Sequence, residues 1–204
     1  MPIILHIETS TDICSVALSE NNECLFFLSN DEGLNHSKLL APFVEKALSV
    51  LQEKNKKLDA VALSEGPGSY TGLRIGTSVA KGLCYGFDIP LIAVPTLAVM
   101  TVEALSKIKT DKPYLLSPMI DARRMEVYTA MYDKKLKIKK EVSAEIITEE
   151  SFLEDLVKSE IYFFGNGMPK CQSLIQHKNA VFIENIVPLA SNMLSLAEDK
   201  YTQK

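Results

Sequence analysis

The order of strand-like and helix-like segments constrains the fold of this chain more than any single motif. The first half begins with short apolar runs separated by polar turns, which predict consecutive strands at residues 3–7, 15–18 and 23–29. Helices and strands then alternate, with strands expected at 58–63 and 91–94 and helices at 36–54, 70–85 and 96–106. Asn35 or Ser37 can cap the first of these helices, and Gly86 can end the second.

The second half repeats this order of elements. Antiparallel strands are expected at residues 114–120, 125–132 and 136–142, followed by strands at 161–164 and 181–183 and helices at 149–158, 169–176 and from 188 onward. The halves share no obvious sequence repeat, so their similarity is inferred from element order alone. The pattern predicts a mixed α/β fold of two similar lobes. Residues 110–113 form the best internal boundary, which places the lobes at 1–109 and 110–204.

Composition and charge narrow the class of protein. The 204 residues are 47% hydrophobic and 24% charged, as in a globular protein with a core. The net charge of −4 argues against a chain that holds nucleic acid by itself, because such binding needs Lys and Arg to neutralise phosphates. No apolar run is long enough for a membrane span, and no secretion signal is found, so we expect a cytoplasmic chain. We expect four reduced thiols, each buried as a small hydrophobe, at Cys14, Cys24, Cys84 and Cys171.

The densest motif is SEGPGSYTGLRIG at residues 64–76, which joins a predicted strand to a predicted helix. Glycines allow close backbone approach and a helix N-terminus favours anions, so a phosphate-binding loop is one interpretation. A P-loop would need Lys followed by Ser or Thr after Gly72, and the chain has Leu73 and Arg74 there. A structural turn at the start of a helix is the favoured interpretation.

The helix that follows this motif has few charges. Its only charged side chains, Arg74 and Lys81, lie one heptad apart on one face, and many of its other residues are small. So narrow a polar stripe indicates a helix buried on most sides. One side is expected to pack on its own sheet. For the other side two interpretations stay open, namely enclosure by its own domain or packing on a partner protein.

Other chemistry is weakly indicated. His6, His36 and His177 are scattered, no two of them at the i, i+4 spacing of a helical zinc pair, and His6 is expected to be a core residue. No GxSxG elbow or recognisable cysteine-protease motif is found. The basic stretch KKLKIKK at 134–140 alternates like a strand with Leu136 and Ile138 inward. A solvated, protected sheet edge is its default explanation, and an auxiliary contact with RNA is the alternative.

Four segments together resemble the TsaB family, also called YeaZ. They are ILHIETST at 4–11, HSKLLAP at 36–42, GPGSYTGLRIG at 66–76 and MIDARRMEVY at 119–128. The resemblance covers nearly the whole chain, and the glycine segment in this context is highly specific. It implies an α/β fold of the actin/hexokinase-like (ASKHA) type with two similar lobes, each a mixed sheet flanked by helices.

The resemblance also implies a function. TsaB proteins are non-catalytic scaffold or activator subunits that pair with the TsaD threonylcarbamoyltransferase, together with the TsaE ATPase, to form threonylcarbamoyladenosine beside the tRNA anticodon. They also self-associate as homodimers and meet tRNA mainly through the complex. Where TsaD carries paired histidines, this chain has PTLAVM at 95–100, which offers no good metal ligand. We therefore expect no catalytic residue, cofactor or metal.

The pairing surface of the family uses its first two helices, which correspond here to 36–53 and 70–85. The implied partner-binding residues are His36, Leu39, Leu40, Phe43, Tyr70, Arg74, Thr77, Ala80, Lys81 and Cys84. A stand-alone metallopeptidase or an actin-fold kinase is the alternative. The scattered histidines weigh against the former. Against the latter, residues 8–12 lack the glycine expected after the first strand of such a kinase.

Overall fold

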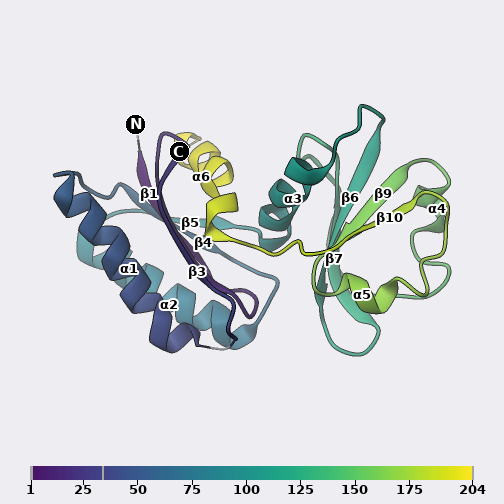
Figure 1. Cartoon of the computed structure of the whole chain (residues 1–204), viewed down its shortest axis with the longest axis horizontal. Helices are drawn as coiled ribbons and strands as arrows, with labels where there is room; N and C mark the ends of the chain where they lie inside the picture. Colours follow the sequence, from purple (N-terminus) through teal and green to yellow (C-terminus); the bar gives the residue numbers. More distant parts are fainter. Residues whose placement is uncertain (1, 34, 204) are drawn as a thin grey trace. The chain divides into compact units, whose positions relative to one another are not determined.

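The computed structural model describes residues 2–33 and 35–203 and contains two five-stranded sheets (Figure 1). The strands of the first sheet are β1 (Ile3–Glu8), β2 (Cys14–Glu20), β3 (Glu23–Asn30), β4 (Ala60–Ser64) and β5 (Leu91–Val94). Those of the second are β6 (Tyr114–Asp121), β7 (Glu126–Tyr132), β8 (Ile138–Ile146), β9 (Glu160–Phe164) and β10 (Ala180–Ile183). The helices are α1 (His36–Glu53), α2 (Tyr70–Phe87), α3 (Thr96–Lys107), α4 (Leu153–Leu156), α5 (Met168–Cys171) and α6 (Leu194–Thr202), with a 3-10 turn at Ala190–Asn192.

The two sheets have the same topology. Their orders are β3-β2-β1-β4-β5 and, read in the same direction, β8-β7-β6-β9-β10. In each sheet the first three strands in sequence pair antiparallel, and the last two add on in parallel. The parallel additions need helical crossovers, which explains why helices separate the later strands. The predicted pair of similar mixed α/β lobes is confirmed.

The division of the chain into two compact units differs from the one expected from a boundary at residues 110–113. One unit contains residues 1–99 and 188–204, and the other contains residues 100–187. The end of the chain returns to the first sheet because the apolar side of α6 packs there. Met193 and Ala197 are fully buried in one cluster with Ile4 and Ala60. The C-terminal segment thus belongs to the first unit rather than to a lobe at 110–204.

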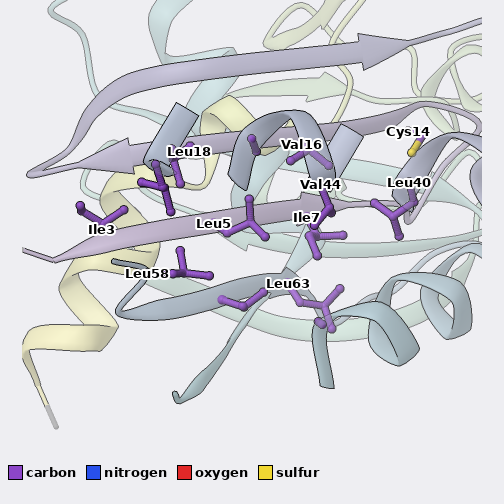
Figure 2. Packing of buried hydrophobic residues seen from close by; sticks show 14 residues of the cluster. Ile3, Leu5, Ile7, Cys14, Val16, Leu18, Leu40, Val44, Leu58 and Leu63 are labelled. Carbon is purple, nitrogen blue, oxygen red and sulfur yellow. The ribbon is translucent and has the colours of Figure 1, made fainter. Parts of the chain in front are cut away.

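The core of the first unit lies between its sheet and the pair α1 and α2. β1 is buried along its whole length, because helices cover both faces of the sheet. Figure 2 shows Leu5 and Ile7 of β1 beside Val16 of β2, with Leu40 and Val44 of α1 packed against them. Burial of each such side chain contributes about 1.5–3 kcal/mol. This cluster holds α1 and α2 in place on one side of the sheet.

Several local predictions were wrong. α2 ends at Phe87 with Asp88 in the left-handed region, so Gly86 lies inside the helix. α4 is a single short turn, because the Thr148 amide donates to Ser151 Oγ and fixes a turn before it. In the basic stretch, Leu136 adopts a left-handed turn conformation and Ile138 is 44% exposed, so these side chains do not alternate into the core.

Two further expectations concern cysteines and membranes. Cys14 and Cys171 are buried like small hydrophobes, but Cys24 is exposed on β3, where a buried thiol was expected. Within residues 2–33 and 35–203, no helix is both long and apolar enough to cross a bilayer.

Candidate protein-binding surface

The glycine motif packs α2 directly on the turn between β1 and β2. The Ser69 amide donates a hydrogen bond of 2.6 Å to the Ser10 carbonyl oxygen. A Cβ atom at Gly72 would lie 2.0 Å from the Thr9 carbonyl oxygen, and one at Gly68 only 2.3 Å from that of Ser10. The glycines are therefore needed for close contact between two parts of this chain. This geometry favours the structural interpretation over a phosphate loop.

α2 has a buried side and an open side. Gly72, Gly76 and Ala80 recur every four residues and are buried on the side that faces the first sheet. On the other side, Tyr70 is 68% exposed and Tyr85 is 93% exposed. The Arg74 guanidinium lies 4.2 Å from the centre of the Tyr70 ring, which gives the charge a partner on its own helix. The open side therefore combines aromatic surface with few charges.

A groove runs between α1 and α2 on this open side. Its first part has a volume of about 490 Å³, and its lining includes Leu48 of α1 together with Val79, Gly82 and Leu83 of α2. A second hollow of about 470 Å³ shares Leu48 with the first and extends to Phe87, which is 53% exposed. We call the groove and the exposed residues of α1 and α2 the helix-pair surface.

The structure divides the ten expected partner-binding residues into two groups. Tyr70, Arg74 and Lys81 are exposed on the helix-pair surface, and four more are partly buried beside it, namely Leu39, Phe43, Thr77 and Cys84. His36, Leu40 and Ala80 are 4%, 1% and 0% exposed. These last three point into the first unit, so their assignment to an exposed partner surface was wrong. They face inward because they lie on the sheet-facing side of their helices.

Residues that sequence reasoning missed dominate the open side. Tyr85 is its most exposed aromatic side chain, Phe87 is 53% exposed, and Gly82 lines the groove. A signal for Tyr85 was present. It follows Lys81 by four residues and Arg74 by eleven, so it extends the same helical stripe that the two charges define. Continuing that stripe by one turn would have identified it.

Two titratable side chains are buried in the first sheet. His6 Nε2 lies 2.7 Å from Ser19 Oγ, and burial lowers the pKa of His6 to about 3, so its ring is neutral. Burial also raises the pKa of Glu8, whose carboxylate accepts a bond from the Ser10 amide. Both side chains are fully enclosed, which was expected for His6 but not for Glu8. In the described part of the chain, no group of three or more His, Cys, Asp and Glu side chains is arranged to hold a metal ion.

The MIDARRMEVY segment contains the end of β6, the turn at residues 122–125 and the start of β7. Arg123 and Arg124 both have positive φ values, and Lys170 stabilises this turn by donating to the Asp121 carboxylate and to the Glu126 carbonyl oxygen at 2.7 Å. The hydrogen bond from Lys170 is the main cause that lowers the pKa of Asp121. The segment therefore has a structural role within the second unit.

Comparison with known proteins agrees with this architecture. The profile of the family TsaD, tRNA N6-adenosine threonylcarbamoyltransferase, matches residues 32–197. The chain is 30% identical to the tRNA threonylcarbamoyladenosine biosynthesis protein TsaB of Buchnera aphidicola subsp. Acyrthosiphon pisum, with 97% of this chain and 85% of that protein covered.

Solved structures extend the comparison to the fold. A ROK family protein from Streptococcus pneumoniae is 9% identical and has a TM-score of 0.51 over 98% of this chain and 99% of its own, which confirms the actin/hexokinase-like fold. YeaZ from Pseudomonas aeruginosa is 27% identical and has a TM-score of 0.80, with 100% of this chain and 93% of its own covered. From sequence motifs, topology and these relatives together, the chain belongs to the TsaB (YeaZ) family.

Proposed function

We propose that this chain is a non-catalytic accessory subunit in the synthesis of threonylcarbamoyladenosine in tRNA. It pairs through the helix-pair surface with a TsaD-type threonylcarbamoyltransferase, a TsaE-type ATPase joins the pair, and the complex acts on tRNA in the cytoplasm. The observation that carries the proposal is the open, aromatic and charge-poor side of α2 in a member of the TsaB family.

The chemistry of the helix-pair surface suits a protein partner. Tyr70, Tyr85 and Phe87 are large aromatic side chains that stand out from α2, and such residues are common binding hot spots. The groove beside them is lined by aliphatic side chains of both helices, together with the polar side chains of Glu45, Ser49, Gln52 and Ser78. A partner that inserts its own side chains there would remove this apolar area from water. Exposed apolar patches rimmed by polar residues are typical of interaction sites.

The family profile supports a TsaD-type protein as the partner. The match to TsaD over residues 32–197 indicates that a TsaD-type subunit shares the fold of this chain, including a related pair of helices. Two such helix pairs can pack face to face around a pseudo-twofold axis. The same patch on a second copy of this chain could do so as well, which gives a homodimer. The homodimer and the heterodimer would then compete for one surface.

A lack of catalytic function fits the local structure after β5. The stretch PTLAVM begins α3, where Leu97 and Val99 are 0% exposed and Met100 is 1% exposed. These positions hold apolar core side chains where the catalytic relative is expected to carry histidine ligands. We therefore propose that the chain acts on the equilibrium of its partner. By linkage, this chain raises the population of the partner's active arrangement only to the extent that it binds that arrangement more tightly than the inactive one.

The test uses a substitution that blocks the groove without disturbing the fold. A Cβ at Gly82 would meet no atom within 4 Å, and Glu favours a helix more than Gly does, so Gly82→Glu should leave the monomer folded. Ser106→Glu adds the same charge at an exposed position of α3 and is the matched control. Each protein is mixed with the TsaD-type subunit of the same genome and examined by light scattering after size exclusion.

We expect a one-to-one complex with the wild type and with Ser106→Glu, and its loss with Gly82→Glu. Circular dichroism checks that each variant is folded. Failure of the wild type to form a complex, with or without tRNA and nucleotide, would contradict the proposal. So would a Gly82→Glu variant that binds the partner as well as the wild type does, because a partner seated in the groove would have to bury the added carboxylate at a cost.

A further inference from the structure

We propose that the lysine turn between β7 and β8 is a direct contact site for the phosphate backbone of tRNA. The lysine turn comprises residues 133–140, which are the loop after β7 and the first three residues of β8, and its five lysines are all exposed. The proposal rests on the proposed function, since that function makes tRNA the RNA in question. It assigns part of the RNA contact to this chain itself.

The net charge of −4 argues against RNA binding by the whole chain, but the negative charge is unevenly distributed. The unit made of residues 1–99 and 188–204 has 9 basic and 13 acidic residues, whereas residues 100–187 have 13 of each. The excess negative charge therefore belongs entirely to the first unit. Within the neutral second unit, five of the basic residues are concentrated in the lysine turn. Such a local concentration can attract phosphates even when the whole chain is acidic.

Protection of a sheet edge explains only part of this cluster. β8 is an edge strand, and lysines on an edge discourage pairing with other chains. Lys139 and Lys140 lie on that strand and form ion pairs with Asp133 at 3.1 Å and with Glu145 at 2.7 Å. Lys134, Lys135 and Lys137 precede the strand, where there is no edge to protect. Among the described residues, these three have no carboxylate partner.

The backbone that carries these three lysines is held in one conformation. The Asp133 carboxylate accepts hydrogen bonds from the Lys135 amide at 2.9 Å and from the Lys137 amide at 3.0 Å. The Asp133 amide in turn donates to the Lys137 carbonyl oxygen at 3.0 Å. A turn ordered before binding loses less conformational entropy when a ligand arrives. The ammonium groups are therefore presented together from a fixed support.

The composition of the lysine turn favours RNA over an acidic protein. Protein interfaces are depleted in lysine, whereas contacts with phosphate oxygens are typically made by Lys and Arg. Tyr132, the nearest aromatic residue before the turn, is only 2% exposed and cannot stack on a base. The site is thus suited to contact with the backbone and not to reading of bases. Binding should be independent of sequence and strongly dependent on salt.

The experiment compares two triple variants with the same change of charge in the same unit. The first carries Lys134→Gln, Lys135→Gln and Lys137→Gln. The control carries Lys109→Gln, Lys112→Gln and Lys178→Gln, which are also exposed positions. Binding of a tRNA transcript is measured against salt concentration, once with each isolated chain at low salt and once with the complex that it forms with the TsaD-type subunit.

For the turn variant we expect the slope of log K against log salt to fall in magnitude by about two, and the affinity to fall about tenfold. The control should bind like the wild type. Equal binding by the turn variant and the wild type in both measurements would overturn the proposal, as would an equal loss in the control. Loss of binding to the TsaD-type subunit by the turn variant would identify a protein contact instead. If no complex forms at all, the proposed function fails, and the isolated chains still decide whether the turn binds RNA.

Discussion

A pair of glycine-to-alanine substitutions in α2 tests how the helix is packed. Gly82→Ala places a methyl group where nothing lies within 4 Å, so it should raise the stability by the helix propensity of Ala, about 0.5–1 kcal/mol. Gly72→Ala gains at most the same stability, about 0.5–1 kcal/mol, from the helix propensity of Ala over Gly. Its methyl carbon, however, would lie 2.0 Å from the Thr9 carbonyl oxygen and 3.2 Å from the Thr9 carbonyl carbon. Both are backbone atoms that cannot move aside by a rotamer change.

Either α2 or the β1–β2 turn must therefore move by about 1 Å. Such overpacking costs typically 1–3 kcal/mol. Loss of the 2.6 Å bond from the Ser69 amide to the Ser10 carbonyl oxygen adds about 1 kcal/mol. After the propensity gain is subtracted, we expect a net destabilisation of about 2 kcal/mol, which for a chain of this size lowers Tm by about 4–8 °C.

Thermal unfolding followed by circular dichroism measures both variants under the same conditions. Gly82→Ala should raise Tm by about 2 °C, whereas Gly72→Ala should lower it. If both variants shift Tm in the same direction, then α2 is not packed on the β1–β2 turn as described.

Two further predictions concern buried groups of the first unit. Ala80→Glu should destabilise the monomer by about 3 kcal/mol or more, because it buries an unpaired carboxylate at a position that is 0% exposed, and urea unfolding should separate it clearly from the folded Gly82→Glu variant. His6 has an ordinary pKa of 6.5 and a folded pKa of about 3, so between these values the folded protein binds one proton fewer than the unfolded chain. This group should therefore lower the unfolding free energy by about 1.4 kcal/mol for each unit that the pH falls through that window. His6→Gln keeps a hydrogen-bonding side chain and should remove that slope, and an unchanged slope in urea unfolding at pH 4–7 would contradict the assignment.

Secondary structure could be predicted closely where a local pattern of apolar and polar residues determines it. The unbroken apolar run of β1 and the helical repeat of α1 each indicate their element directly, and both elements appear at the expected residues. Boundaries were less secure. Gly86 looked like a helix end, but α2 continues for one more residue to Phe87, and Asp88 in the left-handed region caps it. A turn residue shows where a helix can stop and not where packing makes it stop.

The sequence predicts which two helices carry the candidate site, but not which of their residues are exposed on its surface. The small residues of α2 fit equally well against a sheet or against a partner helix, so Ala80 was assigned to the wrong side. Tyr85 and Phe87 were missed because an aromatic side chain near a helix end can lie in the core or on the surface. Exposure depends on which side meets the sheet, and that is decided by contacts such as those of Gly72 with Thr9, 63 residues apart in the chain.

The sequence by itself determined the order of the elements, the doubled α/β arrangement and the family, because each depends on local periodicity or on a contiguous motif. The tertiary structure alone decided which side of α2 stays open, that α6 returns to the first sheet, and that His36, Leu40 and Ala80 are buried. These features arise from packing between segments far apart in the chain. Packing minimises exposed apolar area over the whole unit, and no local pattern records its outcome.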